Sequence, residues 1–233
     1  MILSRKREVP IILGLETRPT LFVYHAYMRT YMIGLGNPGE TYAHTRHNVG
    51  FMVADAVAQK AELTWKHDAK FKAEVAQDMG KGIFLIKPQA FMNKSGEAVG
   101  GIVRYFDKEE LAKTDAPNLQ SVYVCYDDLD IPFGQYKIQF GKHPKIHNGV
   151  NSIIQALGTD QFWNVRIGTE SRLQGTQEGQ QKPQSMDQAS EKIPGETYVL
   201  TPFTKEERDV LAPMIERVVQ EIYAKAFPSQ SSR

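Results

Sequence analysis

The sequence predicts a single α/β domain in which helices flank a mixed central β-sheet and a long helix closes the fold. Short apolar strands alternate with amphipathic helices along most of the 233 residues, which is the pattern of a sheet covered by helices. Two of the strands are joined by a short glycine-containing turn, so at least one strand pair is expected to be antiparallel. With 41% hydrophobic residues, the chain is long enough to bury one core.

In the first half of the chain, three strands and two helices are expected. Residues 30–36 form an apolar run that ends in a glycine-rich turn, which predicts the first strand. A helix follows from about Val49, where apolar residues recur at the spacing of one helical face. Residues 73–77 and 83–87 predict the two strands of a hairpin, and a second amphipathic helix is expected from about Ser95.

The second half of the chain predicts five elements. They are a strand over 121–127 that ends in the acidic run 127–130, a strand over about 135–140, a helix over 148–158, a strand over 164–168 and a final helix over 204–227. Thr204 and Glu207 have the spacing of a capping box, in which each side chain bonds the backbone N–H of the other residue. In folds of this class, function is expected on the loops at the strand ends.

We expect one folded domain at residues 30–228, followed by a short tail at 229–233. Within the domain, residues 171–196 are rich in Gln, Gly, Ser and Pro and nearly free of large apolar side chains. Such a composition cannot bury a core of its own, so this segment predicts a mobile surface insertion.

Residues 1–29 are expected to lie outside the fold. Arg5-Lys-Arg7 and the apolar run after it resemble the charged and apolar regions of a signal peptide, but the run is short and no small-residue cleavage site follows. We therefore favour an extension from an upstream start codon, with Met28 as the working start, over export or an organellar presequence.

Composition narrows the possible functions without fixing one. The 28 basic and 27 acidic residues leave a net charge of +1, so a nucleic acid would have to bind at a local basic cluster. The single cysteine, Cys125, has no partner for a disulfide or a metal, which fits a reducing, cytoplasmic compartment. No apolar stretch approaches the roughly 20 residues that span a bilayer, so we expect a soluble protein with no membrane partner.

The glycine-rich turn Gly34-Leu-Gly-Asn-Pro-Gly39 matches the G-x-G-x-x-G fingerprint of dinucleotide-binding proteins. In those proteins the turn opens directly into a helix whose N-terminus meets the pyrophosphate. Here a polar segment separates the glycines from the helix expected at Val49, and the acidic residue required about 20 positions later falls at the end of a helix. A nucleotide-dependent oxidoreductase is therefore the weaker alternative.

Polar residues gather at four places where one predicted element ends and the next begins. These places hold Asn37 with His47, Asn93, Asp127 and Asn148. Each residue alone is readily explained as a cap or a turn residue. A histidine just before a helix meets the positive end of the helix dipole, which favours the neutral ring and so suits a general base.

Together, these places resemble the bacterial-type peptidyl-tRNA hydrolase family. The resemblance rests on blocks in the family's order and spacing: Gly34-Leu-Gly-Asn-Pro-Gly39, Tyr42 with Thr45-Arg-His-Asn48, Lys87-Pro88 with Phe91-Met-Asn-Lys-Ser-Gly96, Asp127-Asp-Leu-Asp130, His147-Asn-Gly149 and Arg166-Ile-Gly168. It implies the phosphorylase-like fold of that family. It also implies an enzyme that hydrolyses the ester between a peptide and the 3′-terminal ribose of tRNA, without a metal or cofactor, and so frees tRNA for translation.

The resemblance further implies a role for each site residue. His47 would be the general base that takes a proton from the attacking water, and Asp127 would orient its ring. Asn93 would hold the developing oxyanion or position the water. Asn37 and Asn148 would bind the peptide main chain near the ester. The other substrate contacts that the resemblance implies are Tyr42, Phe91 and Met92.

A local basic cluster is expected to meet the tRNA. It consists of Lys137, Lys142, His143, Lys145 and Arg166. By the resemblance, Lys137 and Arg166 would clamp the 5′ phosphate of the acceptor stem while the catalytic residues take the CCA end. The alternative is a solvated basic loop without a ligand. We expect a monomer with no obligate protein partner.

The chain departs from the family's pattern at residues 141–146. A glycine-rich loop is usual there, whereas Pro144 and Ile146 restrict the backbone of this chain. Gln139 also stands where a basic residue is common. A non-catalytic RNA-binding relative is a second alternative, but the enzyme is favoured by the retention of His47, Asp127, Asn37 and Asn93.

Overall fold

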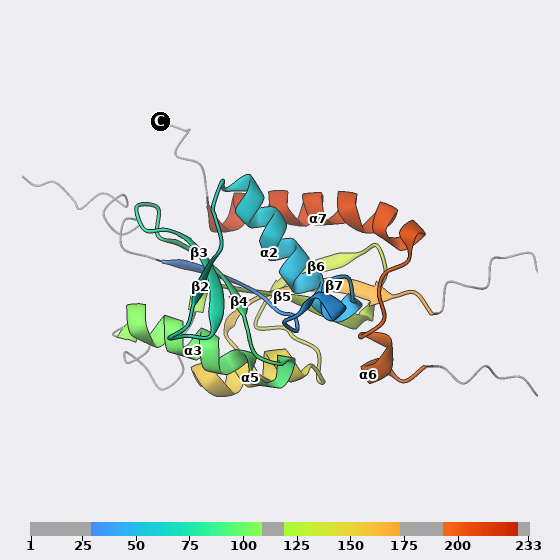
Figure 1. The fold of residues 1–233 in the computed structure, drawn as a ribbon, viewed down its shortest axis with the longest axis horizontal. Coiled ribbons are helices and arrows are strands. Elements are labelled where there is room, and N and C mark those ends of the chain that lie inside the picture. The colour runs from blue at the N-terminus through green and yellow to red at the C-terminus, as the bar shows by residue number, and fades with distance from the viewer. Residues whose placement is uncertain (1–28, 109–118, 173–192, 228–233) are drawn as a thin grey trace, which may run out of the picture.

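The computed structural model describes residues 29–108, 119–172 and 193–227. These residues form an α/β domain around a seven-stranded mixed sheet with the order β2-β3-β4-β1-β5-β7-β6 (Figure 1). The strands are β1 (Thr30–Gly34), β2 (Lys66–Asp68), β3 (Ala73–Asp78), β4 (Ile83–Pro88), β5 (Leu119–Pro132), β6 (Tyr136–Phe140) and β7 (Phe162–Glu170). The predicted fold class is confirmed.

Strand direction divides the sheet into a parallel centre and antiparallel edges. The pairs β4–β1, β1–β5 and β5–β7 are parallel. At one edge β2 and β3 form antiparallel pairs, and at the other β6 runs antiparallel to β7. The carboxyl ends of the parallel strands therefore meet at one end of the sheet, which is where open α/β sheets place their ligands.

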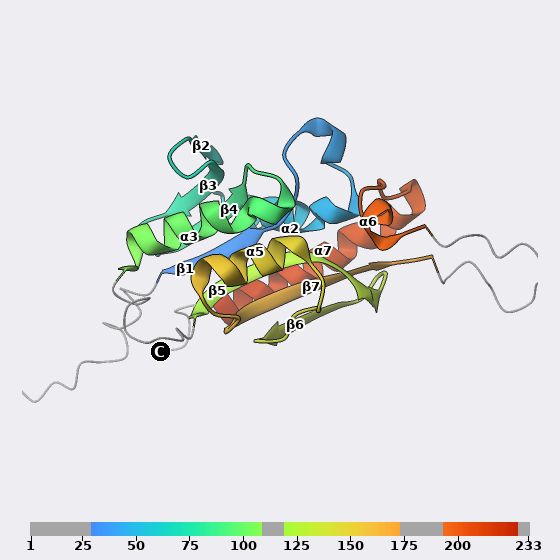
Figure 2. The same ribbon diagram turned by 90° about the horizontal axis from the view of Figure 1, so that it is seen from below.

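Helices cover both faces of the sheet. The long helices are α2 (Val49–Lys60), α3 (Ser95–Phe106), α5 (Asn148–Leu157) and α7 (Lys205–Ala226), and the short ones are η1 (Glu40–Tyr42), η2 (Arg46–Asn48), η3 (Met92–Lys94) and α6 (Gly195–Tyr198). Helices α2 and α7 lie on one face, and α3 and α5 lie on the other (Figures 1 and 2). No helix in the described part of the chain has the length and apolar character of a membrane span.

The core consists of two apolar layers, one on each face of the sheet. Alternation along β1 places Tyr31 and Ile33 in the layer under α3 and α5, and Met32 in the layer under α2 and α7. The single cysteine, Cys125, is fully buried in the second layer, where burial raises the pKa of its thiol and so keeps it in the unreactive protonated form. The predicted capping box of the last helix is present, with Thr204 as N-cap and Glu207 as its partner.

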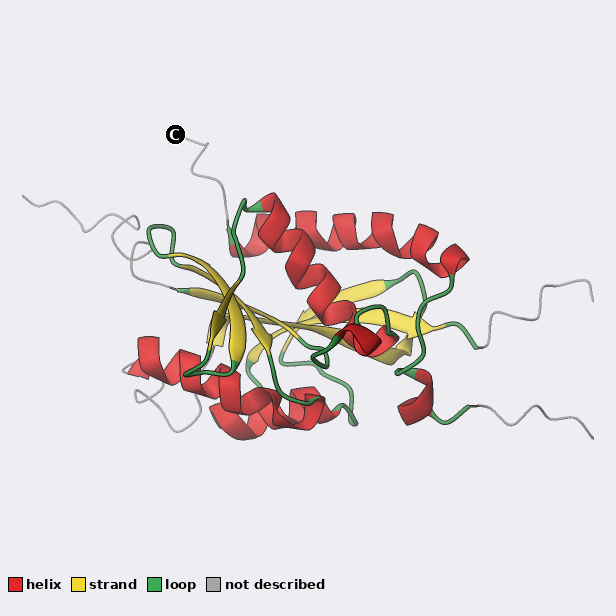
Figure 3. Cartoon of the chain, viewed as in Figure 1, coloured by secondary structure: helices red, strands yellow, loops and turns green. Residues whose placement is uncertain are grey.

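Several predicted boundaries were wrong (Figure 3). Strand β5 does not end at Asp127, because Asp127 and Asp128 still pair with β7 before the register shifts. Strand β2 was not predicted, since three polar residues at a sheet edge show no apolar alternation. Helix α6 begins at Gly195, inside the predicted insertion 171–196. The prediction that this insertion is mobile falls mainly on residues 173–192, which lie outside the described residues, as do 1–28 and 228–233.

Candidate active site

The glycine-rich turn after β1 leaves no room for a pyrophosphate, because the start of α2 is packed directly against it. A Cβ atom at Gly34 would lie 2.4 Å from the carbonyl oxygen of Gly50, and one at Gly36 would lie 2.7 Å from the ring of Phe51. Of the three turn glycines, only Gly39 has a positive φ, at 104°. The first two glycines thus allow α2 to pack closely against the turn, and the dinucleotide alternative loses its structural basis.

His47 and Asp127, which are expected from the sequence to act together, are in direct contact. Nδ1 of His47 lies 2.7 Å from Oδ1 of Asp127. His47 comes from η2, just before α2, and its side chain keeps 13% of its surface exposed, whereas the Asp127 side chain is 3% exposed. Among the described residues, none hydrogen-bonds to Nε2 of His47, so that nitrogen is free to accept a proton.

His147 is a third member of this cluster that sequence reasoning did not single out. Its Nε2 lies 3.2 Å from the same oxygen of Asp127, and its Nδ1 accepts the backbone N–H of Val150 as the N-cap of α5. Because Nδ1 is an acceptor, the proton of the neutral ring sits on Nε2 and is donated to Asp127. The signal was available, since His147 immediately precedes the predicted Asn148.

Asp127 is held as a carboxylate in spite of its burial. Burial raises its pKa, but the charge of His47 and the hydrogen bonds from His147 and His47 outweigh that effect and hold the pKa well below its usual range. An ionised Asp127 accepts the Nδ1–H of His47, which leaves the lone pair of that ring on Nε2. The arrangement therefore fixes the tautomer in which His47 can act as a base.

The same three side chains present a donor set that could be taken for a metal centre, with ligand-type atoms all within 4.8 Å of one another. The hydrogen bonds argue against this use. A metal on Nε2 of His147 would move the ring proton to Nδ1, which already accepts the N–H of Val150. The cluster thus fits a hydrogen-bonded acid–base group better than a metal site.

Asn37 is fixed so that only its amide nitrogen remains available. Its side-chain oxygen accepts the backbone N–H of Met92 at 2.9 Å, which identifies that oxygen within the amide. Asn48 holds the Asn37 backbone from the other side, accepting its N–H and donating to its carbonyl, both at 2.9 Å. Among the described residues, no acceptor bonds the Asn37 side-chain nitrogen, which can therefore donate to a ligand.

Met92 and Gly149 bring two further elements of the site together. A Cβ at Gly149 would lie 2.4 Å from the sulfur of Met92, so η3 and the start of α5 pack in direct contact. Asn93 comes directly after Met92, and Asn148 comes directly before Gly149. Both asparagines are exposed. Phe91, at 61% exposure, leaves a large apolar ring on the surface beside them. Met92 itself is buried, so its side chain packs between η3 and α5 rather than facing solvent.

Tyr42 is the predicted site residue that the structure connects least. It lies in η1 and is half-buried. Its backbone carbonyl accepts the Thr45 hydroxyl, and among the described residues no contact joins its ring to the histidine cluster.

Lys137 and Arg166 lie directly opposite each other on the antiparallel pair β6–β7, so their side chains share one face. Arg166 is not a free cation: its Nε donates to Asp128 at 2.7 Å and its Nη1 donates to Gln139 at 3.2 Å. Lys137 is exposed. The two predicted phosphate contacts are thus neighbours, with the guanidinium held in place and the ammonium free to move.

The loop that departs from the family pattern is pinned at several points. Pro144 is buried, and its carbonyl lies 2.9 Å from Nδ1 of His143. Gly141 takes a positive φ of 61° and donates to the carbonyl of Phe162. Ile146, immediately before His147 in the chain, is 86% exposed. The loop is therefore held to the domain by the bond of Gly141 and the burial of Pro144, and it exposes the apolar side chain of Ile146.

Comparison with known proteins agrees with the motifs. The model of the family described as "Peptidyl-tRNA hydrolase" matches residues 31–230. A peptidyl-tRNA hydrolase of Chloroflexus aggregans is 36% identical over 82% of this chain and 89% of its own length. One of Mycolicibacterium gilvum is 37% identical over 80% and 84%. The crystal structure of the peptidyl-tRNA hydrolase from Acinetobacter baumannii shares the fold with a TM-score of 0.66, at 24% identity over 87% of this chain and 90% of that one.

Proposed function

The chain belongs to the peptidyl-tRNA hydrolase family, and on that premise we propose that it hydrolyses the ester between a peptide and the 3′-terminal ribose of tRNA. The observation that carries the proposal is the contact of His47 Nδ1 with the Asp127 carboxylate, which leaves His47 Nε2 free as a base. The products are free tRNA and a peptide with a carboxylate terminus.

The reaction follows from the protonation states of this cluster. His47 Nε2 takes a proton from a water that attacks the ester carbonyl, and Asp127 stabilises the imidazolium that forms. The side-chain N–H of Asn93 donates to the carbonyl oxygen as it becomes negative. When the intermediate collapses, the imidazolium returns its proton to the departing ribose oxygen. The carboxylic acid product then releases its own proton to solvent, so His47 is the one residue of the cluster that must gain and lose a proton, and the step needs no metal or cofactor.

Substrate selection is assigned to the amides around the cluster. The free side-chain N–H of Asn37 meets a carbonyl of the peptide, and the exposed Asn148 meets the peptide main chain from the other side. Phe91 and Tyr42 line the route of the CCA end, and Lys137 with Arg166 take the 5′ phosphate of the acceptor stem. We also propose that residues 30–228 form the catalytic unit and act as a cytoplasmic monomer.

The test is release of tRNA from N-acetyl-aminoacyl-tRNA by the full chain. We expect turnover of this blocked substrate and little turnover of the same aminoacyl-tRNA with a free amino group. Addition of 1,10-phenanthroline, which removes transition metals but leaves Mg²⁺ on the tRNA, should not change the rate. Binding of tRNA without ester cleavage would overturn the proposal and favour a non-catalytic RNA-binding protein.

A further inference from the structure

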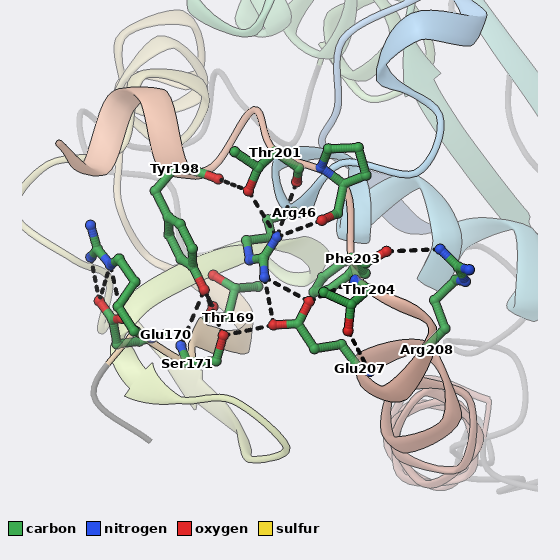
Figure 4. A network of polar contacts seen from close by, with 12 residues as sticks. Arg46, Thr169, Glu170, Ser171, Tyr198, Thr201, Phe203, Thr204, Glu207 and Arg208 are labelled. Carbon is green, nitrogen blue, oxygen red and sulfur yellow. Dashed lines mark hydrogen bonds and ion pairs between the residues drawn. The ribbon is translucent and has the colours of Figure 1, made fainter. Parts of the chain in front are cut away.

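Arg46, the residue immediately before His47, is held by more hydrogen bonds than either histidine of the cluster. Its Nη1 donates to the carbonyls of Thr201 and Pro202 and to the Thr201 hydroxyl, at 3.2, 2.8 and 2.9 Å (Figure 4). Its Nη2 donates to both carboxylate oxygens of Glu207, at 2.5 and 2.6 Å. The side chain is 5% exposed, so these contacts are shielded from water.

Aromatic rings fix the plane of the same guanidinium. Its central carbon lies 4.3 Å from the centre of the Tyr198 ring and 5.1 Å from that of Phe203. A planar, delocalised cation satisfies the rings, the two carbonyls and the carboxylate together, whereas the compact ammonium of lysine does not.

The backbone of η2 is held by the same partner segment, residues 198–207, which we call the bracket. The N–H of Arg46 donates to the carbonyl of Thr201 at 3.1 Å, and the N–H of His47 donates to that of Val199 at 2.8 Å. Thr45 forms an isolated β-bridge with Pro202. The N–H groups of Arg46 and His47 thus donate to the bracket, whereas the carbonyls of Thr45 and Arg46 accept from Asn48 and Val49 next to them in the chain.

The bracket is in turn fixed to the body of the domain. Glu207 belongs to the capping box of α7 and also accepts the Ser171 hydroxyl at 2.6 Å, just after the end of β7. Partial burial raises the pKa of Glu207. Its hydrogen bonds and the charge of Arg46 lower that pKa by more than burial raises it, so Glu207 remains a carboxylate. The bracket thus links η2 to α7 and to the sheet.

Asp127, by contrast, is placed by β5, which pairs with β7 independently of η2. The separation of His47 Nδ1 and Asp127 Oδ1 therefore depends on how η2 is seated relative to the sheet. We propose that Arg46 is a positioning residue for His47: it seats η2 against the bracket and thereby sets the hydrogen bond to Asp127 and the direction of Nε2. Its effect on turnover rests on the proposed function, but its effect on the hydrogen bond does not.

The experiment compares Arg46→Lys with a matched control, Arg172→Lys. Arg172 also pairs with a carboxylate, Glu170, and also lies 4.3 Å from the Tyr198 ring, but no described contact joins it to η2. Both variants lose a guanidinium beside the same ring and keep the charge. Only Arg46→Lys removes the contacts that seat the turn.

Two readouts are taken on each folded variant. The first is the downfield ¹H signal of His47 Nδ1–H in the free protein, which reports the bond to Asp127 without any substrate. The second is kcat and KM on N-acetyl-aminoacyl-tRNA. A misplacement of the base on the order of 1 Å costs about 100-fold in rate, so we expect Arg46→Lys to lower kcat by about 10- to 100-fold with KM unchanged, and to broaden or remove the signal.

For Arg172→Lys, we expect the signal to remain and kcat to change less than about twofold, since the catalytic geometry is untouched. Glu207→Gln, which keeps an oxygen for Arg46 and for the cap, gives the same direction at smaller size and replaces Arg46→Lys if that variant does not fold. An unchanged Nδ1–H signal and kcat in Arg46→Lys, or equal losses in both lysine variants, would overturn the proposal. A native protein without turnover would contradict the proposed function instead, while the signal would still decide the role of Arg46.

Discussion

Arg46 and His47, neighbours in one short turn, each contact a carboxylate, the partly buried Glu207 and the buried Asp127, and the two carboxylates have very different partners. Glu207 accepts two hydrogen bonds from Arg46, one from Ser171 and one from the backbone of Thr204. Among the donors in the described part of the chain, Asp127 accepts from two histidine rings alone, at 2.7 and 3.2 Å.

The difference lies in what the donors can do. Arginine stays charged at every relevant pH, so the contact of Arg46 with Glu207 cannot change state and serves only to hold the chain. Histidine gains and loses a proton near neutral pH, and His47 keeps one nitrogen without a partner among the described residues. The ion pair of Arg46 with Glu207, which is held by several hydrogen bonds, thus gives rigidity, and the adjacent histidine with a free ring nitrogen gives chemistry.

Replacing the carboxylate of the catalytic cluster should produce the largest effect. Asp127→Asn removes the charge that fixes the His47 tautomer and stabilises its imidazolium, so kcat should fall by about 10²- to 10⁴-fold. Single-turnover release of tRNA measures this loss. Asp128→Asn is the matched control on the next residue, and because Asp128 contacts Arg166 rather than His47, it should raise KM and spare kcat. Equal losses of kcat in both variants would remove the distinction.

Breaking the pair of Arg46 with Glu207 should instead cost stability. Arg46→Met leaves Glu207 buried without its cation, which typically destabilises a fold by about 3–5 kcal/mol. His47→Ala should cost less, about 1.5–3 kcal/mol, because it removes one hydrogen bond to a charged group and Asp127 keeps its hydrogen bond from His147. Urea unfolding of the two variants gives both values. If they proved equally stable, Arg46 would not anchor the turn.

Acid should lower the stability of the fold by protonating Glu207 and Asp127, because the pKa of each carboxylate is lowered in the folded protein. A carboxylate whose pKa is lower in the folded state stabilises the fold above its unfolded pKa of about 4, and this contribution is lost as pH falls below that value. The free energy of unfolding should therefore be steady above about pH 5 and fall below it. In Glu207→Gln the fall should be shallower, and an unchanged pH dependence of melting temperature would exclude Glu207 as a contributor.

Selection of the blocked substrate should depend on Asn37. Asn37→Ala removes one hydrogen bond to the peptide, worth about 1 kcal/mol, so the preference for N-acetyl-aminoacyl-tRNA over the unblocked form should fall by up to about tenfold. The ratio of kcat/KM for the two substrates measures it. An unchanged ratio would assign selection to another residue.

The smallest effect is expected far from the cluster, at Lys137. Lys137→Ala removes one phosphate contact, so KM should rise a few-fold and the slope of log KM against log salt should fall by about 1. The slope measured between low and moderate salt, with kcat as control, tests this. A native slope would leave Arg166, held by Asp128, as the residue that meets the phosphate.

Local sequence patterns predicted several helices and a helix cap, because these features depend on residues that are close together in the chain. Apolar spacing predicted α2 and α3, and residue pairs such as Thr204 with Glu207 predicted a cap that forms as expected. The motifs also predicted the contact of His47 with Asp127, although these residues are far apart in the chain. Substrate contacts of Asn93, Asn148, Phe91 and Tyr42 stay predictions.

Long-range contacts without a local pattern escaped prediction. The bracket around Arg46 joins residues more than 150 positions apart, as the bond from Arg46 to Glu207 illustrates, and no periodicity links them. The second bond to Asp127 came from His147, which the motif contained but whose side chain could equally have been a cap alone. The acidic run at 127–130 resembled a strand end, yet pairing with β7 carries the strand through it.

The assignment of His47 as the general base is tested most directly by single-turnover hydrolysis of N-acetyl-aminoacyl-tRNA by His47→Ala, measured beside its free energy of unfolding. We predict that the rate falls by about 10²- to 10⁴-fold while the variant stays folded, with its free energy of unfolding lowered by no more than about 3 kcal/mol. A rate within about twofold of the native protein, at unchanged stability, would contradict a general-base role for His47.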